Sequence, residues 1–363
     1  MSVLFLAFVV SSGVTFFVIR SARTHARFSS DADMSGPQKF HAKPVPRIGG
    51  AGIVVGLAAA LLAALLLRGR DMGVGLVLLS TAAPAFLAGL AEDLTKSQSP
   101  RRRLFFTVVS AVLAAWVLDA VIRRTDIPGI DWLVTFAVPA WIITVFAVAG
   151  VANSINIIDG FNGLAAMCVV MMLGSIAYVA FQTQDAVIGL CALAGLGAVM
   201  GFFIWNFPAG LIFLGDGGAY FLGFYVGELS ILLLGRNPDV SPLCPLLMCI
   251  YPIVETVFSM YRRKVVRGRP MGMPDGVHLH SLIYRRLMRW AVGDRTAKVL
   301  TKRNSMTAPY LWLLCMMSVV PATIFWNNSA VLAAFIVLFG ATYVFLYVRI
   351  VKFKAPGWLI VRR

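Results

Sequence analysis

Apolar segments of about 20 residues recur almost from one end of this 363-residue chain to the other. A bilayer core of about 30 Å is crossed by about 20 residues of α-helix. With only 13% of its residues charged, the chain has too little polar surface for a soluble protein of this length. The pattern predicts a single membrane-embedded, all-α domain over residues 1–363, with about eleven transmembrane helices. We expect them near 2–20, 48–67, 73–91, 104–122, 132–152, 163–181, 186–205, 219–234, 242–260, 307–326 and 330–349.

The distribution of basic residues predicts the orientation. If the N-terminus lies outside, in the periplasm, the predicted inner segments carry 27 of the 32 Lys and Arg residues. The C-terminus is then cytoplasmic, because inner loops are enriched in Lys and Arg. Most of the net charge of +16 follows from such basic loops. Some of these residues are also candidates to bind anionic membrane lipids or phosphate substrates, whereas no recognised module indicates a nucleic-acid partner.

Polar residues are concentrated in a few islands, and the densest is N-S-I-N-I-I-D-G-F-N-G-L-A over residues 153–165. On a helix, Asn153, Asn156, Asp159 and Asn162 follow one another at intervals of three and share one face. Buried amides and carboxylates are costly unless they face protein, water or a ligand. The row therefore indicates a binding site, with a hydrogen-bonded helix interface as the alternative.

Two further islands contribute carboxylates. In F-L-G-D-G-G-A, residues 213–219, three glycines surround Asp216, so that backbone N–H groups can meet an anion while the carboxylate takes a cation. A plain turn is the alternative. Glu92 and Asp93 end an apolar segment side by side and repel each other unless a cation or a proton is near. The alternative is a solvated charge pair beside Lys96.

Two basic islands complete the set. Lys43 and Arg47 lie in K-P-V-P-R-I-G-G and are candidates for phosphate binding, or else an ordinary basic flank of a span. His278 and His280 are two residues apart, so they do not share a helix face as a helical zinc pair would. They are candidates for phosphate contact from an irregular loop, or ordinary loop histidines. The islands together suggest one polar site that holds metal and phosphate, on the cytoplasmic side within residues 40–285.

In this order the islands resemble the polyprenyl-phosphate N-acetylhexosamine-1-phosphate transferase family. The resemblance runs from about residue 40 to 285, and N-x-x-N-x-x-D-G-x-N-G-L-A with F-L-G-D-G-G is its most specific part. It places the family's acidic pair on Glu92 and Asp93, where Asp-Asp is usual. Its D-G-x-D-G motif falls on Asp159 and Asn162, where the second Asp is lost. Its histidine motif falls on His278 and His280, with Ser281 replacing the last His.

The resemblance and the polar patterns together define the expected site. Catalytic roles are expected for Glu92, Asp93, Asp159, His278 and His280. Asp216 is the expected ligand of Mg²⁺, with Mn²⁺ as the alternative metal. Substrate contacts are expected from Lys43, Asn153, Asn156, Gly160, Asn162, Asn206, Arg262 and Arg263.

The resemblance implies an enzyme of the bacterial inner membrane with its active site facing the cytoplasm. It would transfer N-acetylhexosamine 1-phosphate from a UDP-amino sugar to undecaprenyl phosphate and release UMP. This step would initiate a lipid-linked glycan such as O-antigen or capsule. The expected partners also include a second copy of the chain, as a homodimer. The alternative functions are a transporter of nucleotide sugar or lipid-linked sugar, which also places polar groups at broken helices, and an inactive scaffold.

Overall fold

The computed structural model describes residues 1–21, 45–69, 73–266, 268, 276–288 and 296–354. Every regular element in these ranges is a helix, apart from isolated bridge residues at Pro46 and Met288. The carbonyl of Pro46 accepts a hydrogen bond from the N–H of Phe213. The elements are α1 (Ser2–Arg20), α3 (Gly49–Arg68), α4 (Gly73–Thr81), α5 (Ala83–Thr95), α6 (Pro100–Val117), α7 (Ile130–Val134), α8 (Ala137–Ile158), α9 (Leu164–Gln182), α10 (Ala186–Asn206), α11 (Gly215–Arg236), α12 (Leu243–Met248), α13 (Ile250–Tyr261), the π-helix η2 (Arg262–Val266), α14 (Leu279–Arg286), α15 (Ala297–Ser305), α16 (Ala308–Ile324) and α17 (Ser329–Val351).

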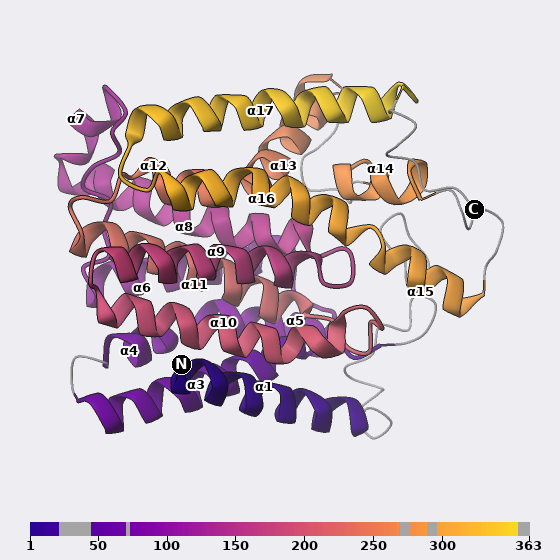
Figure 1. The fold of residues 1–363 in the computed structure, drawn as a ribbon, viewed down its shortest axis with the longest axis horizontal. Helices are drawn as coiled ribbons and strands as arrows, with labels where there is room; N and C mark the ends of the chain where they lie inside the picture. The colour runs from indigo at the N-terminus through magenta and orange to yellow at the C-terminus, as the bar shows by residue number, and fades with distance from the viewer. Residues whose placement is uncertain (22–44, 70–72, 267, 269–275, 289–295, 355–363) are drawn as a thin grey trace.

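Within the described residues, eight helices are long and apolar enough to cross a membrane. The number rises to nine if α4 and α5, which meet at an angle of 46°, form one broken span. The chain is therefore a polytopic, all-helical membrane protein, as its apolar pattern predicts. The long helices lie roughly parallel in one bundle (Figure 1).

Two of the eleven expected spans differ from this set for physical reasons. The span expected at 104–122 corresponds to α6, which begins earlier and includes the charges of residues 101–103. The span expected at 242–260 is divided into two short helices, α12 and α13, which meet at Cys249. The count of eleven and the orientation in the membrane remain predictions.

Helix α11 lies at the centre of the bundle and is buried along almost its whole length. It packs against α3, α5, α8 and α9. Glycines allow the closest of these approaches: Gly218 of α11 faces Gly50 of α3, and Gly217 faces Gly89 of α5. A Cβ atom on Gly89 would lie 2.5 Å from the backbone of Gly217. Small residues at such crossings let membrane helices pack backbone against backbone. Residues 215–218 are thereby held between two neighbouring helices.

The polar islands gather at the end of the bundle where α14 and α15 lie (Figure 1). Several residues of these islands occupy helix ends. Asp93 lies in the last turn of α5, Asn153 and Asn156 in the last turns of α8, and Asp216 in the first turn of α11. Helix ends have unpaired backbone N–H or C=O groups, which polar side chains can satisfy.

Candidate active site

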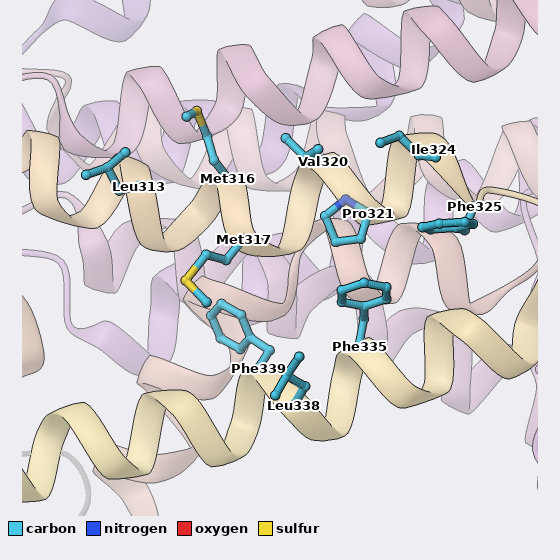
Figure 2. Close-up of a pocket in the computed structure, with 10 residues that line it drawn as sticks. All are labelled: Leu313, Met316, Met317, Val320, Pro321, Ile324, Phe325, Phe335, Leu338 and Phe339. Atoms are coloured by element: carbon cyan, nitrogen blue, oxygen red, sulfur yellow. The ribbon is translucent and has the colours of Figure 1, made fainter.

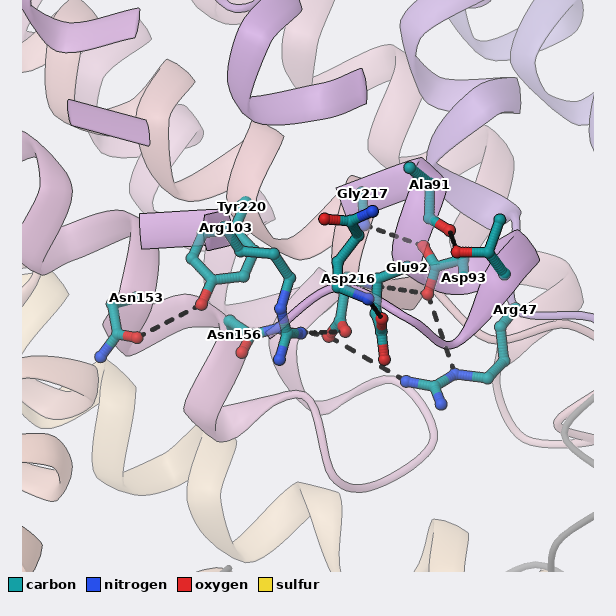
Figure 3. A network of polar contacts seen from close by, with 12 residues as sticks. Arg47, Ala91, Glu92, Asp93, Arg103, Asn153, Asn156, Asp216, Gly217 and Tyr220 are labelled. Atoms are coloured by element: carbon teal, nitrogen blue, oxygen red, sulfur yellow. Dashed lines mark hydrogen bonds and ion pairs between the residues drawn. The ribbon is translucent and has the colours of Figure 1, made fainter. Parts of the chain in front are cut away.

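Asp93 caps the start of α11. Its Oδ1 atom accepts a hydrogen bond from the N–H of Asp216 at 2.8 Å, and its Oδ2 atom accepts one from the N–H of Gly217 at 2.9 Å. The side chain is almost completely buried. A carboxylate at this position pairs with the free N–H groups and the positive end of the helix dipole. Asp93 thus connects the last turn of α5 to the helix that carries Asp216 (Figure 3).

Gly215 permits this contact. Its φ of +77° lies in the left-handed region, which other residues rarely adopt. A Cβ atom there would also overlap the Arg47 carbonyl and lie 2.5 Å from Asp93 Oδ2. The glycine before Asp216 is therefore required by both backbone conformation and space.

Asp216 is the centre of a polar network (Figure 3). Arg103, from the first turn of α6, forms an ion pair with its Oδ2 atom. The Nδ2 group of Asn156 donates a hydrogen bond to its Oδ1 atom at 2.7 Å. Arg47 lies between the two carboxylates, with its Nε atom 3.9 Å from Asp93 Oδ1 and its terminal nitrogen 4.0 Å from Asp216 Oδ1. Two cations and two carboxylates thus meet at one point of the structure.

Arg47 was a candidate for phosphate binding from its sequence motif, whereas no motif indicated Arg103. The guanidinium of Arg103 also lies over the ring of Tyr220, 5.8 Å from its centroid. The hydroxyl of Tyr220 donates a hydrogen bond to Asn153 Oδ1 at 3.4 Å. The available signal for Arg103 was its place in an Arg-Arg-Arg run that begins eight residues after Asp93. Only the structure distinguishes it from its two neighbours in that run, because its position on α6 faces α11.

Asp159 lies in the loop that follows α8 and is partly buried. Burial raises the pKa of its carboxyl from 3.8 to about 7; the positive charge of Arg47 opposes this rise, and the negative charge of Asp216 adds to it. The charges of Arg47 and Asp216 therefore act on the carboxyl of Asp159. With this pKa its carboxyl exchanges a proton near neutral pH.

Glu92 takes a different direction from its neighbour. Its Oε2 atom accepts a hydrogen bond from the N–H of Gln98 at 2.6 Å, and the side chain is only partly buried. The structure therefore assigns this carboxylate to the loop between α5 and α6. The two members of the acidic pair differ in environment although they are adjacent in sequence.

His280 contacts the loop that carries Asp159, and His278 packs against His280. Both are buried, and their rings stack with centroids 5.0 Å apart. His280 lies edge-on to Phe161, at 5.6 Å, and next to Gly160, where an added Cβ would be 3.5 Å from its Nε2 atom. His278 Nδ1 lies 3.1 Å from Oε1 of Glu255 in α13. The loop of residues 159–163 thus contacts His280, while the charges of Arg47 and Asp216 act on Asp159.

Asn162 and Asn206 hold this loop in place. Asn206 Oδ1 accepts a hydrogen bond from the N–H of Gly163 at 2.6 Å, and its Nδ2 group donates one to the Ile212 carbonyl at 2.7 Å. Asn162 donates from its backbone to Asn304 Oδ1 at 2.9 Å and from its side chain to Ser305 Oγ at 3.1 Å. These contacts with α15 are absent from the sequence analysis. The expected substrate contacts of both asparagines stay predictions.

The remaining expected residues lie elsewhere or cannot be placed. Arg262 is the first residue of η2, directly after α13, and is buried, with its guanidinium 5.7 Å from the ring centroid of Tyr347 in α17. Arg263 follows it in η2 and is partly exposed. Lys43 lies outside the described residues.

An apolar groove of about 500 Å³ lies between α16 and α17, toward the end of the bundle away from α15 (Figure 2). Its lining consists of ten aliphatic, aromatic, proline and methionine side chains, among them Met317, Pro321 and Phe339. Such a surface suits lipid hydrocarbon and not a nucleotide. The polar cluster and this groove are therefore chemically distinct regions of the molecule.

Comparison with known proteins identifies the family. The sequence profile described as "Glycosyl transferase family 4" matches residues 75–234, which include Asp93, Asp159 and Asp216. A protein of Saccharolobus solfataricus, named a putative UDP-N-acetylglucosamine–dolichyl-phosphate N-acetylglucosaminephosphotransferase, is 30% identical over 232 residues. The match covers 62% of this chain and 69% of that protein. The chain belongs to glycosyl transferase family 4.

Two bacterial relatives agree with this assignment. A probable undecaprenyl-phosphate N-acetylglucosaminyl 1-phosphate transferase of Bacillus subtilis is 28% identical over 296 residues, covering 80% of this chain and 78% of the relative. A phospho-N-acetylmuramoyl-pentapeptide-transferase of Geobacillus kaustophilus is 28% identical over 244 residues, covering 64% and 74%. The family expected from the motifs is confirmed, and this glycosyl transferase family 4 member is a membrane transferase.

Proposed function

We propose that the protein transfers N-acetylhexosamine 1-phosphate from a UDP-amino sugar to undecaprenyl phosphate, with release of UMP. The observation that carries the proposal is the convergence of Asp93, Asp159 and Asp216 with Arg47 and Arg103 at one end of a membrane-helix bundle. The printed names of the relatives support the same reaction class. The proposed location is the bacterial inner membrane, with this end of the bundle in the cytoplasm and the product entering a lipid-linked glycan.

The arginines address the main physical obstacle, which is repulsion between two anionic reactants. In the structure Arg47 lies next to Asp93, and Arg103 forms an ion pair with Asp216. A bound diphosphate would draw on the same guanidinium groups, whose planar donors match phosphate oxygens. Since the second pKa of a phosphate monoester is about 6, the lipid phosphate is already mostly dianionic at neutral pH. We therefore propose direct in-line attack on the sugar-linked phosphorus, with positioning and charge neutralisation as the main contributions.

The oxygen-rich cluster also fits Mg²⁺. This ion is usually bound through one or two carboxylates together with substrate phosphates, rather than in a cage made only of protein groups. The described residues contain no group of three or more His, Cys, Asp or Glu arranged as a metal cage. Asp216, with Asn156 beside it, is the proposed ligand. Bound metal would supply charge stabilisation at the diphosphate.

The hydrogen bonds distinguish Asp93 from Asp159 as candidate proton acceptors. Both oxygens of Asp93 already accept backbone N–H groups, which suits an anchor of α11. Among the described residues the carboxyl of Asp159 accepts no such backbone hydrogen bonds, and with a pKa of about 7 it can hold a proton at working pH. We propose that Asp159 exchanges the proton if the lipid phosphate arrives as a monoanion.

Release of UMP tests the proposal. Purified protein in detergent is supplied with Mg²⁺, undecaprenyl phosphate and each of a panel of UDP-sugars. We expect UMP and a lipid diphosphosugar in equal amounts, and no UMP without the lipid phosphate. Movement of a sugar across vesicles without UMP would favour the transporter alternative, and absence of both would favour the scaffold.

A further inference from the structure

Glu255 is a buried carboxylate that the sequence analysis did not identify. It lies on α13, only 1% of its side chain is exposed, and its Oε1 atom is 3.1 Å from His278 Nδ1. The same oxygen accepts a hydrogen bond from the N–H of Leu279 at 2.8 Å. Leu279 is the first residue of α14, the helix that carries His280. One carboxylate thus contacts both the ring of one histidine and the start of the helix that holds the other.

The chemistry of this contact defines the histidine tautomer. An ionised carboxylate can only accept hydrogen bonds, so the nitrogen that faces it must carry a proton. His278 would then have its proton on Nδ1, and Nε2 would be the unprotonated nitrogen. The tautomer and ring orientation of a functional histidine are commonly set by the group bonded to its other nitrogen.

We propose that Glu255 is a positioning residue that fixes the Nδ1–H form and the orientation of His278, and with them the place of His280 against Gly160. The inference rests on the proposed function insofar as His278 contacts substrate. Stacking of the two rings, at an angle of 11°, transmits the position of His278 to His280. Glu255 itself acts through His278 and touches neither substrate nor metal.

A spectroscopic experiment tests the tautomer without any substrate. The chain has only four histidines, so long-range hydrogen–nitrogen NMR correlations of their rings form a small set. The His278 signals are assigned by their loss in His278→Gln. In the wild-type protein we expect a proton on Nδ1, and in Glu255→Gln a shift of the population toward Nε2–H. A wild-type His278 without a proton on Nδ1 would overturn the proposal.

Kinetics distinguish positioning from general stabilisation. Outer partners of functional histidines typically contribute about 10- to 100-fold, and we expect a fall in kcat of this size for Glu255→Gln, with a smaller change in KM for the UDP-sugar. If Glu255 acts through His278, the double variant Glu255→Gln/His278→Gln should be no slower than His278→Gln alone. Full additivity of the two losses would contradict the proposal.

Glu228→Gln is the matched control. Glu228 is also fully buried, on α11, and its carboxylate oxygens have no hydrogen-bond partner among the described residues. We expect this variant to retain the wild-type kcat and His278 spectrum. A wild-type protein with Nδ1–H on His278 but without UMP release would refute the proposed function and leave the positioning role standing.

Discussion

Asp216 receives contacts from three side chains, Arg47, Arg103 and Asn156, and its own N–H is held by Asp93. Asn at this position keeps the size of the side chain but loses its charge. We expect Asp216→Asn to lower UMP release by more than about 100-fold at any practical Mg²⁺ concentration, because a charge at the transferred phosphate is lost. The measurement is the initial rate over a Mg²⁺ titration.

The control for this variant is Asp119→Asn, which removes the charge of an exposed carboxylate paired with Arg123 in the loop after α6. We expect its rate to match that of the wild type. Near-normal activity of Asp216→Asn would refute the ligand assignment.

Asp93 and Glu92 allow a second comparison between adjacent carboxylates. Asp93→Asn replaces one of the two side-chain oxygens that accept backbone N–H groups by an amide NH₂, which is a donor. In Glu92→Gln the side-chain oxygen can still accept the hydrogen bond from the N–H of Gln98. Hydrogen bonds to charged groups contribute about 1.5–3 kcal/mol, so we expect a lower unfolding temperature and a larger loss of activity for Asp93→Asn. The shape of the pH–rate profile should not change, since Asp93 acts as an anchor. Loss of the acidic limb in this variant alone would instead show that Asp93 is the base.

Asp159 predicts a pH dependence of stability. Its carboxyl has a pKa of about 7 in the folded protein against an ordinary value of 3.8, so the folded state binds more protons between these values. Its contribution to the free energy of unfolding therefore falls as pH rises from about 4 to about 7 and is constant above that. We expect the stability of Asp159→Asn, measured relative to that of the wild type, to be higher at pH 8 than at pH 5. Unfolding temperatures in EDTA measure this, and parallel curves would argue against the raised pKa.

At the scale of the element, the crossing of α5 and α11 positions the carboxylates. Gly89→Ala would place a methyl group 2.5 Å from the backbone of Gly217 and 2.7 Å from the carbonyl carbon of Asp216. We expect the helices to separate, with a loss of about 1–3 kcal/mol of stability and a marked loss of activity. Gly340→Ala on α17 is the control, because its added Cβ meets nothing within 4 Å. Equal unfolding temperatures and rates in both variants would show that the crossing tolerates the methyl group.

The elements also show what sequence patterns can and cannot resolve. Helices α1, α9, α10 and α17 agree closely with the apolar segments, since hydrophobic length alone determines a span. Helix α8 extends six residues beyond the expected end, because Asn153 and Asn156 can hydrogen-bond across the bundle. The apolar run at 242–260 is divided at Cys249, a break that no residue pattern indicated.

For the whole molecule, the orientation in the membrane is the main open prediction. The carboxylate cluster lies at the same end as α14 and α15, which belong to the most basic segment of the chain. Because basic segments face the cytoplasm, we expect a reporter fused after Arg363 to report a cytoplasmic location and one fused before Met1 a periplasmic location. A periplasmic signal from the C-terminal fusion would remove one span from the expected eleven.

The sequence by itself determined the membrane-helix class, the family and the residue types of the site. Apolar length, charge bias and local motifs are properties of neighbouring residues, so they can be read without the fold. Only the tertiary structure selected Arg47 and Arg103 as partners of Asp216, separated the role of Asp93 from that of Glu92, and brought Glu255 to His278. These pairs are joined by contacts between helices distant in sequence or depend on the direction of a single side chain, and packing of the bundle decides both.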